Sequence, residues 1–159
     1  MKFKRLLQII FVLLVILSSA NYSFGMGALT SDFPCGSQNL AVNAACNFTE
    51  MDGNVMTSSG FPDPGCGGGF ANFSPDAWFQ ITVPPSGSII VTSGAGSITD
   101  GVMAIYSGTC VGLNLIACND DAPASTMPEI SLTGQTPGDI LWVRFWDFDE
   151  LEGTFEICA

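Results

Sequence analysis

Two aspartates stand side by side in the stretch CNDDA, where Asp120 and Asp121 follow the cysteine and asparagine of the same stretch. Adjacent carboxylates repel each other, and no basic residue stands nearby in the sequence to relieve the repulsion. A bound cation would relieve this repulsion, so the adjacent carboxylates favour a cation site. Ca²⁺ prefers carboxylate oxygens, carbonyl oxygens and water as ligands. The alternative is that the two side chains cap turns through hydrogen bonds to the backbone.

The charge of the whole chain is also strongly acidic. It contains 4 Lys and Arg against 15 Asp and Glu, and it has no histidine. Three of the four basic residues lie within the first five positions, so Arg144 is the one Lys or Arg that follows them. Phosphate binding requires clustered Lys and Arg, so we expect no nucleic-acid partner. Anionic membrane surfaces should repel such a chain as well.

The N-terminal residues have the pattern of a secretory signal peptide. A basic start, MKFKR, precedes the apolar run LLQIIFVLLVIL and the small residues of SSANYSFG. We predict a signal peptide over residues 1–25, with cleavage after Ala20 or Gly25; an uncleaved anchor is the alternative. The apolar run is short for a membrane span, so we expect a secreted or cell-surface protein without membrane insertion after cleavage. Residues 26–159 then form a single domain.

All six cysteines lie in this predicted domain. An even number of cysteines in a secreted chain predicts disulfides, and a zinc site is disfavoured because there is no close Cys-x-x-Cys pair and no histidine. We predict the pairs Cys35–Cys158, Cys46–Cys66 and Cys110–Cys118, the last requiring the chain to turn back near 112–114.

Short apolar or alternating runs, separated by Gly, Pro, Ser and Asn, replace helical periodicity after the signal peptide. This pattern predicts an all-β fold, an antiparallel β-sandwich of the jelly-roll kind. The stretch 60–76 is rich in Gly and Pro and should be a long loop, either held by a disulfide through Cys66 or functional. The expected strands cover residues 38–44, 78–83, 88–93, 102–107, 113–118, 129–134, 140–148 and 153–159.

The strand ILWVRFWDF, residues 140–148, carries large aromatic side chains around a cation. Alternation places Leu141, Val143 and Phe145 on one face, which suits a core. Trp142, Arg144 and Trp146 then lie on the other face, with the guanidinium between two indoles. These three residues are a candidate platform for a sugar or protein ligand, or they are buried for packing.

Three stretches together resemble a known kind of domain: SITDGVMAIYSGTC, LIACNDDA and WVRFWDFDELEGTFEIC. They are similar to a β-sandwich module of secreted Bacteroidota proteins that is related to pre-peptidase C-terminal domains. Their order also resembles a CUB domain, in which an Asp precedes one strand and a Cys ends the next. The resemblance covers roughly Cys35 to Cys158 and departs from CUB domains in the cysteine positions and in the long loop.

The CUB resemblance implies calcium held by loop carboxylates. Carried over by position, it adds Asp100, Asp147 and Asp149 to the aspartates of CNDDA as candidate metal ligands. The predicted cofactor is therefore Ca²⁺, and no residue is predicted to be catalytic.

The sequence favours a non-catalytic function. Without histidine, histidine-dependent triads are excluded, and disulfide-bonded cysteines cannot act as nucleophiles. We expect a secreted or cell-surface accessory module that binds a glycan or an extracellular protein and is stabilised by calcium. The alternatives are a glycan-acting hydrolase that uses paired carboxylates, and a structural spacer domain of a larger secreted enzyme.

Overall fold

The computed structural model describes residues 28–29, 31–67 and 71–159, and the predicted signal peptide lies outside them. The described residues form ten β-strands and no α-helix. No helix of this part of the chain is long and apolar enough to span a membrane. The strands are β1 (Ala28–Leu29), β2 (Gln38–Asn39), β3 (Thr49–Asp52), β4 (Asp76–Thr82), β5 (Ile89–Ala95), β6 (Gly101–Thr109), β7 (Gly112–Asn119), β8 (Glu129–Leu132), β9 (Ile140–Asp147) and β10 (Thr154–Cys158).

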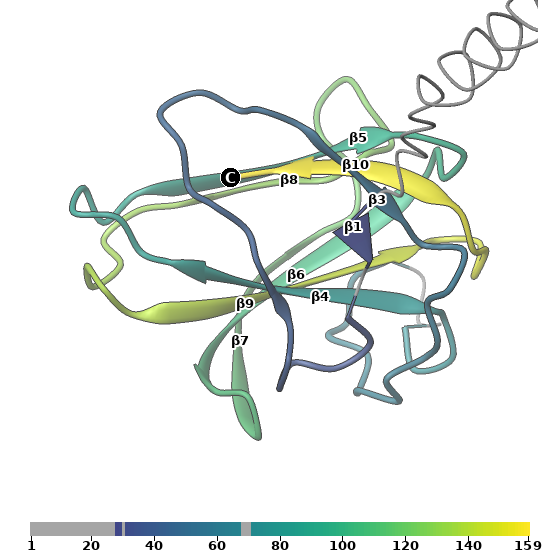
Figure 1. Cartoon of the computed structure of the whole chain (residues 1–159), viewed down its shortest axis with the longest axis horizontal. Helices are drawn as coiled ribbons and strands as arrows, with labels where there is room; N and C mark the ends of the chain where they lie inside the picture. The colour runs from purple at the N-terminus through teal and green to yellow at the C-terminus, as the bar shows by residue number, and fades with distance from the viewer. Residues whose placement is uncertain (1–27, 30, 68–70) are drawn as a thin grey trace, which may run out of the picture.

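The strands form two five-stranded sheets that lie face to face (Figure 1). The β10 sheet has the order β1-β3-β10-β5-β8, and the β9 sheet has the order β2-β4-β9-β6-β7. All neighbouring strands are antiparallel except the short pairs β1–β3 and β2–β4. The predicted all-β antiparallel sandwich is therefore confirmed.

The sequence pattern predicts one strand over residues 38–44, but this segment contributes to both sheets. Its first two residues form β2 beside β4, and Leu40 donates its N–H to the carbonyl of Gln80 at 2.9 Å. The chain then crosses to the β10 sheet, where Asn43 donates to the carbonyl of Ala159 at 2.9 Å. Alternation alone cannot show this change of partner, because an extended backbone looks the same beside either sheet.

The alternation in β9 divides the buried residues into two cores. Leu141, Val143 and Phe145 point between the sheets, as predicted, and the Phe145 ring stacks on Phe155 with centroids 4.1 Å apart. Trp142, Arg144 and Trp146 point to the outer face of the β9 sheet, where a second buried cluster forms. Strand β9 is therefore buried on both faces.

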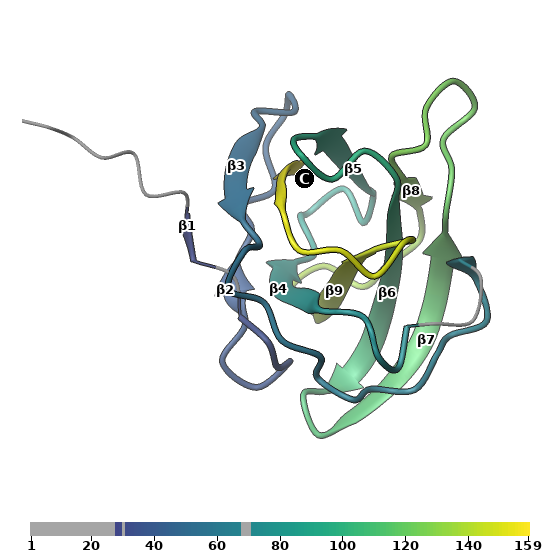
Figure 2. The ribbon, with the colours of Figure 1, turned by 90° about the vertical axis from the view of Figure 1, so that its right-hand side faces the viewer.

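The long loop between β3 and β4 covers that outer face (Figure 2). Phe61, Cys66 and Ala71 from this loop pack into the second cluster with Trp78 of β4 and Tyr106 of β6. The Phe61 ring meets the rings of Trp78 and Tyr106 edge-on, with centroids 5.2 and 5.6 Å apart. The prediction of a loop held by a disulfide is confirmed, because Cys66 is bonded to Cys118 of β7.

All six cysteines form disulfides, but the predicted pairing is wrong. The bonds join Cys35 to Cys110, Cys46 to Cys158 and Cys66 to Cys118, with Cα atoms 5.0, 5.4 and 6.2 Å apart. A Cys110–Cys118 bond is excluded by the β6–β7 register. Cys118 pairs with Ala104, so about 20 Å of strand separates it from Cys110.

The other two predicted pairs fail because of the change of sheet. Cys66 lies on the outer face of the β9 sheet, whereas Cys46 lies beside β10 of the opposite sheet. Cys46 therefore bonds the end of β10, and Cys35 is left to tie the N-terminal segment to Cys110 at the tip of the β6–β7 hairpin.

Candidate metal centre

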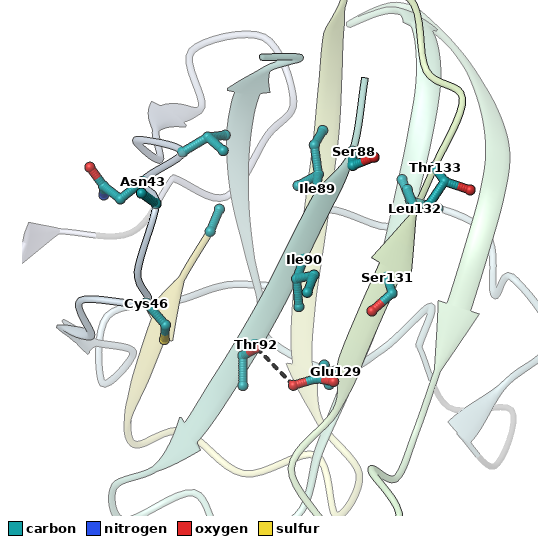
Figure 3. A pocket seen from close by; sticks show the side chains of 13 residues that line it. Asn43, Cys46, Ser88, Ile89, Ile90, Thr92, Glu129, Ser131, Leu132 and Thr133 are labelled. Carbon is teal, nitrogen blue, oxygen red and sulfur yellow. Dashed lines mark hydrogen bonds between the residues drawn. The ribbon is translucent and has the colours of Figure 1, made fainter. Parts of the chain in front are cut away.

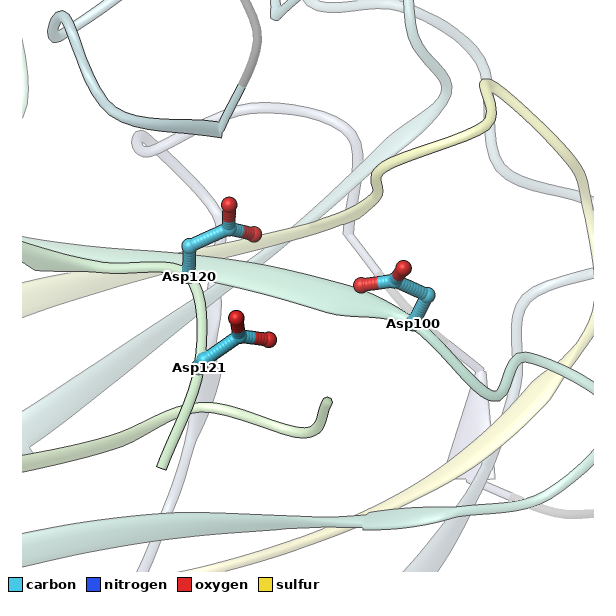
Figure 4. A group of neighbouring side chains, drawn as sticks. All are labelled: Asp100, Asp120 and Asp121. Atoms are coloured by element: carbon cyan, nitrogen blue, oxygen red, sulfur yellow. The ribbon is translucent and has the colours of Figure 1, made fainter. Parts of the chain in front are cut away.

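Asp100, Asp120 and Asp121 meet at one edge of the β9 sheet (Figure 4). Asp100 immediately precedes β6, and the two adjacent aspartates immediately follow β7. These strands are antiparallel neighbours, in which Met103 pairs with Asn119. The beginning of β6 and the end of β7 consequently lie at the same edge, and the hairpin brings the three carboxylates together.

The spacing of the three carboxylates suits one shared cation. One oxygen from each side chain lies within 4.8 Å of the chosen oxygens of the other two. Two oxygens that bind the same Ca²⁺ at about 2.3–2.6 Å can be at most about 5 Å apart. Figure 4 shows the carboxylates of Asp120 and Asp121 turned toward that of Asp100. Three carboxylates supply up to six oxygens, within the six to eight that calcium takes.

One oxygen in this cluster is buried without a partner. The Oδ1 atom of Asp120 is closed off from solvent and accepts no hydrogen bond. A buried polar atom without a partner costs free energy, and such atoms are rare in folded proteins. A cation bound among the three carboxylates would satisfy it.

The electrostatic environment disfavours the three negative charges in the absence of a cation. Burial raises the pKa of Asp120, and repulsion from Asp121 and Asp100 raises it further. Burial also raises the pKa of Asp100, with additional repulsion from Asp121, Asp149 and Asp147. Of the four Lys and Arg in the sequence, only Arg144 lies in the described part, and it is fully buried in the second cluster.

Hydrogen bonds hold both loops of the cluster in place. The Asn119 side-chain amide donates to the carbonyls of Asp121 and Glu129 at 3.0 and 2.8 Å, which ties the end of β7 to β8. Phe148 donates its N–H to the carbonyl of Asp100 at 3.0 Å. The carboxylates are therefore presented by backbone that is fixed from two sides.

Asp147 and Asp149 do not join the other three predicted ligands. The Oδ2 atom of Asp147 accepts the N–H groups of Asp149 and Leu151 at 3.1 and 2.9 Å, so this buried carboxylate caps the turn after β9. Burial raises the pKa of Asp147, and the two backbone hydrogen bonds act in the opposite direction. Asp147 and Asp149 instead lie close enough to Asp100 to repel its charge.

The predicted ligand platform on β9 is buried. Trp142 is 8 % exposed, and Arg144 and Trp146 are fully buried, because the β3–β4 loop covers this face. The prediction that these side chains meet a ligand at the surface is therefore wrong, and the alternative of burial for packing holds. Of the predicted position between two indoles, the contact with Trp146 is present in the interior, with 4.9 Å between the guanidinium carbon of Arg144 and the ring centroid. The second indole is Trp78 of β4, at 5.6 Å, rather than the predicted Trp142.

Sequence reasoning missed Asp76, the partner of the buried cation. Asp76 begins β4 and lies opposite Trp146 of β9. This pair is two residues along the strands from the pair that Trp78 forms with Arg144. A carboxylate at the head of the apolar run DAWFQITV was the available signal, because a buried strand rarely starts with an unpaired charge.

Fold and site together define a disulfide-linked antiparallel β-sandwich with a three-carboxylate cluster on its loops. No protein-family model matches the chain, and no curated protein matches it. Among solved structures, it is similar to the pre-peptidase C-terminal domain of a collagenase from Bacillus anthracis, with 9% sequence identity and a TM-score of 0.44. That likeness covers 76% of this chain and 91% of the other, and it is a likeness of β-rich fold.

Proposed function

We propose that this protein is a non-catalytic, secreted or cell-surface accessory module whose acidic loop edge binds Ca²⁺ through Asp100, Asp120 and Asp121. The bound calcium fixes the loop before β6 and the loop after β7 relative to each other. The edge they form then meets a glycan or an extracellular protein. Loops held by a rigid sandwich commonly carry binding functions in this way.

The observation that carries the proposal is the buried, unpartnered Oδ1 of Asp120 inside a group of three converging carboxylates. Water can solvate exposed carboxylates, but it does not reach this atom, and neighbouring charges add to its cost. The resemblance to CUB domains, which hold calcium through loop carboxylates, supports the same ion. With three carboxylates on open loops, we expect a dissociation constant of about 10⁻⁴–10⁻³ M, typical of extracellular modules.

Secretion is supported by the three disulfides, which form and persist in oxidising compartments. A non-catalytic role is supported by the side chains available for chemistry. The sequence has no histidine, and the described cysteines are all bonded. The carboxylates of the cluster converge on a space between themselves, as metal ligands do.

The first test is the melting temperature of the oxidised domain, residues 26–159, in excess CaCl₂ and in EDTA. A ligand that binds only the native state stabilises it by about 2.7 kcal/mol at a hundredfold excess over its dissociation constant. For a domain of this size we expect calcium to raise the melting temperature by several degrees. Isothermal titration calorimetry then gives the stoichiometry, for which we expect one ion.

The matched variants separate site binding from general screening of acidic charge. The double variant Asp120→Asn, Asp121→Asn should lose the calcium response. Asp139→Asn, which removes an exposed charge at the opposite end of β9, should keep it. An equal response in all three proteins, or none in the unmodified domain, would contradict a specific calcium site. A polysaccharide hydrolysed by the domain, with loss of activity in one carboxylate variant, would favour the hydrolase alternative.

A further inference from the structure

Strand β7 is the longest edge strand among the described residues, and its outer side has no partner there. It closes the β9 sheet, and it has eight residues, whereas the edge strands β1, β2 and β8 have two, two and four. Within the described part of the chain, no backbone hydrogen bond from outside the β6–β7 pair reaches residues 112–118. Figure 1 shows the β6–β7 hairpin projecting beyond the rest of the sandwich. An unpaired edge of this length is a template for a further strand.

The turn of the hairpin fixes which backbone groups of β7 point outward. Residues 110–111 form a two-residue turn, so β6 and β7 close at the pair of Thr109 with Gly112. Hydrogen-bonded and non-hydrogen-bonded pairs alternate along the ladder from that closing pair. The N–H and C=O groups of Leu113 and Leu115 consequently point away from β6, toward the open side of the sheet.

The side chains of β7 lack the charges that commonly protect an edge strand. The segment 102–119 contains no Asp, Glu, Lys, Arg or Pro, although the whole chain is strongly acidic. Leu115 is 47% exposed, and Val111 is 88% exposed at the hairpin tip. The edge strand β8, by contrast, carries Glu129, which accepts a hydrogen bond from Thr92 at 3.0 Å beside an apolar groove (Figure 3). Charged side chains on an edge oppose pairing with another chain, so β7 is the open edge.

We propose that two copies of this chain pair through the hairpin end of β7, antiparallel and about a two-fold axis at Asn114. In this register Leu113 of one copy lies opposite Leu115 of the other, so the outward backbone groups of both leucines are satisfied. The β-bulge at Ile116 interrupts the regular ladder, which confines the contact to the hairpin end. A two-fold interface must be self-complementary, and an uncharged strand paired with itself meets that condition. The proposal is independent of calcium binding.

The distribution of charge selects the antiparallel arrangement. Asp120 directly follows β7, and antiparallel pairing places the Asp120 residues of the two copies about 40 Å apart along the strands. That separation is several times the Debye length of about 8 Å at physiological ionic strength. A parallel pair would instead bring the two acidic clusters side by side. No cationic side chain of the described surface could offset them, because Arg144 is fully buried.

Sedimentation velocity of the oxidised domain in EDTA tests the self-association. The contact is small, so we expect a dissociation constant of about 10⁻⁴ M, measured at protein concentrations up to about 1 mM. Raising NaCl from about 0.05 to 0.5 M should strengthen the dimer, because salt screens the repulsion between two acidic copies. A domain that stays monomeric over these ranges, or a dimer that salt dissociates, would overturn the proposal.

Two variants with the same substitution locate the contact. Leu115→Lys places a charge on the paired edge and should weaken the dimer about tenfold or more. Leu151→Lys makes the same change at a 58%-exposed position in the turn after β9, and it should leave the dimer nearly unchanged. Equal weakening by the two variants would place the contact elsewhere and contradict pairing through β7.

A cysteine on the two-fold axis tests the register without a change of charge. In the proposed dimer the two Asn114 residues form a non-hydrogen-bonded pair with Cα atoms about 4.5 Å apart, which a disulfide can span. Asn114→Cys should therefore give a cross-linked dimer on mild oxidation, with position 114 of both copies in one peptide. Thr109→Cys, exposed on β6 of the same hairpin, should cross-link much more slowly. Equal rates would indicate random collision and overturn the register. Because these experiments are made in EDTA, their outcome does not depend on whether the aspartate cluster binds calcium.

Discussion

Arg144 and Asp76 form an ion pair in which the guanidinium Nε lies 2.6 Å from Asp76 Oδ2, and both side chains are fully buried. The guanidinium also donates to the carbonyls of Pro62 and Ala71, two residues of the β3–β4 loop that covers it. Ser59 donates its backbone N–H and its hydroxyl to Asp76. One buried pair thus fastens the β3–β4 loop to the outer face of the β9 sheet.

Removing the carboxylate of this pair should be strongly destabilising. Asp76→Leu leaves a buried guanidinium without its counter-ion, and we expect a loss of about 3–5 kcal/mol in the free energy of unfolding. Replacing both residues, as Asp76→Leu with Arg144→Met, should cost less than the single change, because no buried charge is left unpaired. Urea unfolding of the two variants measures the difference. A double variant less stable than Asp76→Leu would contradict the pair's role.

Neutralising one carboxylate of the acidic cluster should stabilise the calcium-free protein. Asp120→Asn removes a charge that is partly buried and repelled by Asp121 and Asp100. The melting temperature of this variant in EDTA should therefore exceed that of the unmodified domain. In CaCl₂ the order should reverse, because the variant has lost a ligand. Differential scanning calorimetry in both buffers checks this crossing. Asp139→Asn, remote from the cluster, should show no crossing.

The response to calcium should depend on pH. The folded-state pKa values of Asp100 and Asp120 are raised above the ordinary 3.8, so between that pH and the raised values the folded protein binds more protons than the unfolded chain. These two groups therefore make the calcium-free fold less stable as the pH rises through that window. Calcium requires both carboxylates ionised, so protons compete with it. Titration calorimetry should show weaker calcium binding at about pH 4, close to the ordinary pKa, than at about pH 7.5. Equal affinity at both values would contradict ligation by these groups.

Removing the disulfide that anchors the long loop should loosen that loop first. Cys66→Ser with Cys118→Ser breaks the bond between the loop and β7, and we expect a loss of about 2–5 kcal/mol in stability. Limited proteolysis should then cut within residues 57–75 before the strands are cut. Peptide mapping of the unmodified domain should recover the pairs 35–110, 46–158 and 66–118. Recovery of a Cys110–Cys118 peptide would contradict the β6–β7 register.

Glu150 adopts a left-handed backbone conformation with φ of 63° in the turn after β9. An L side chain in that conformation costs about 1 kcal/mol, and glycine does not incur the cost. Glu150→Gly should therefore stabilise the domain by about 0.5–1 kcal/mol in urea unfolding. Glu152→Gly removes the same charge and side chain at an exposed position without a left-handed φ, and it should have no stabilising effect.

Much of the fold follows from local patterns that the sequence displays. Alternation identified most of the strands and assigned Leu141, Val143 and Phe145 to the core, because the side-chain period of a strand is a property of the backbone itself. The CNDDA stretch likewise marked Asp120 and Asp121 as a place where carboxylates repel each other. The even number of cysteines in the predicted domain indicated disulfides before any pairing was known.

Tertiary structure decided the features that depend on which strands become neighbours. The β6–β7 hairpin brings Asp100 to Asp120 and leaves Asp147 to cap a turn. The covering loop turns Trp142 and Trp146 from a possible surface into a second core around Arg144. The pairing of Cys46 with Cys158 likewise depends on the point at which the chain crosses between the sheets. Such contacts join residues far apart in sequence, and a periodicity of two residues carries no information about them.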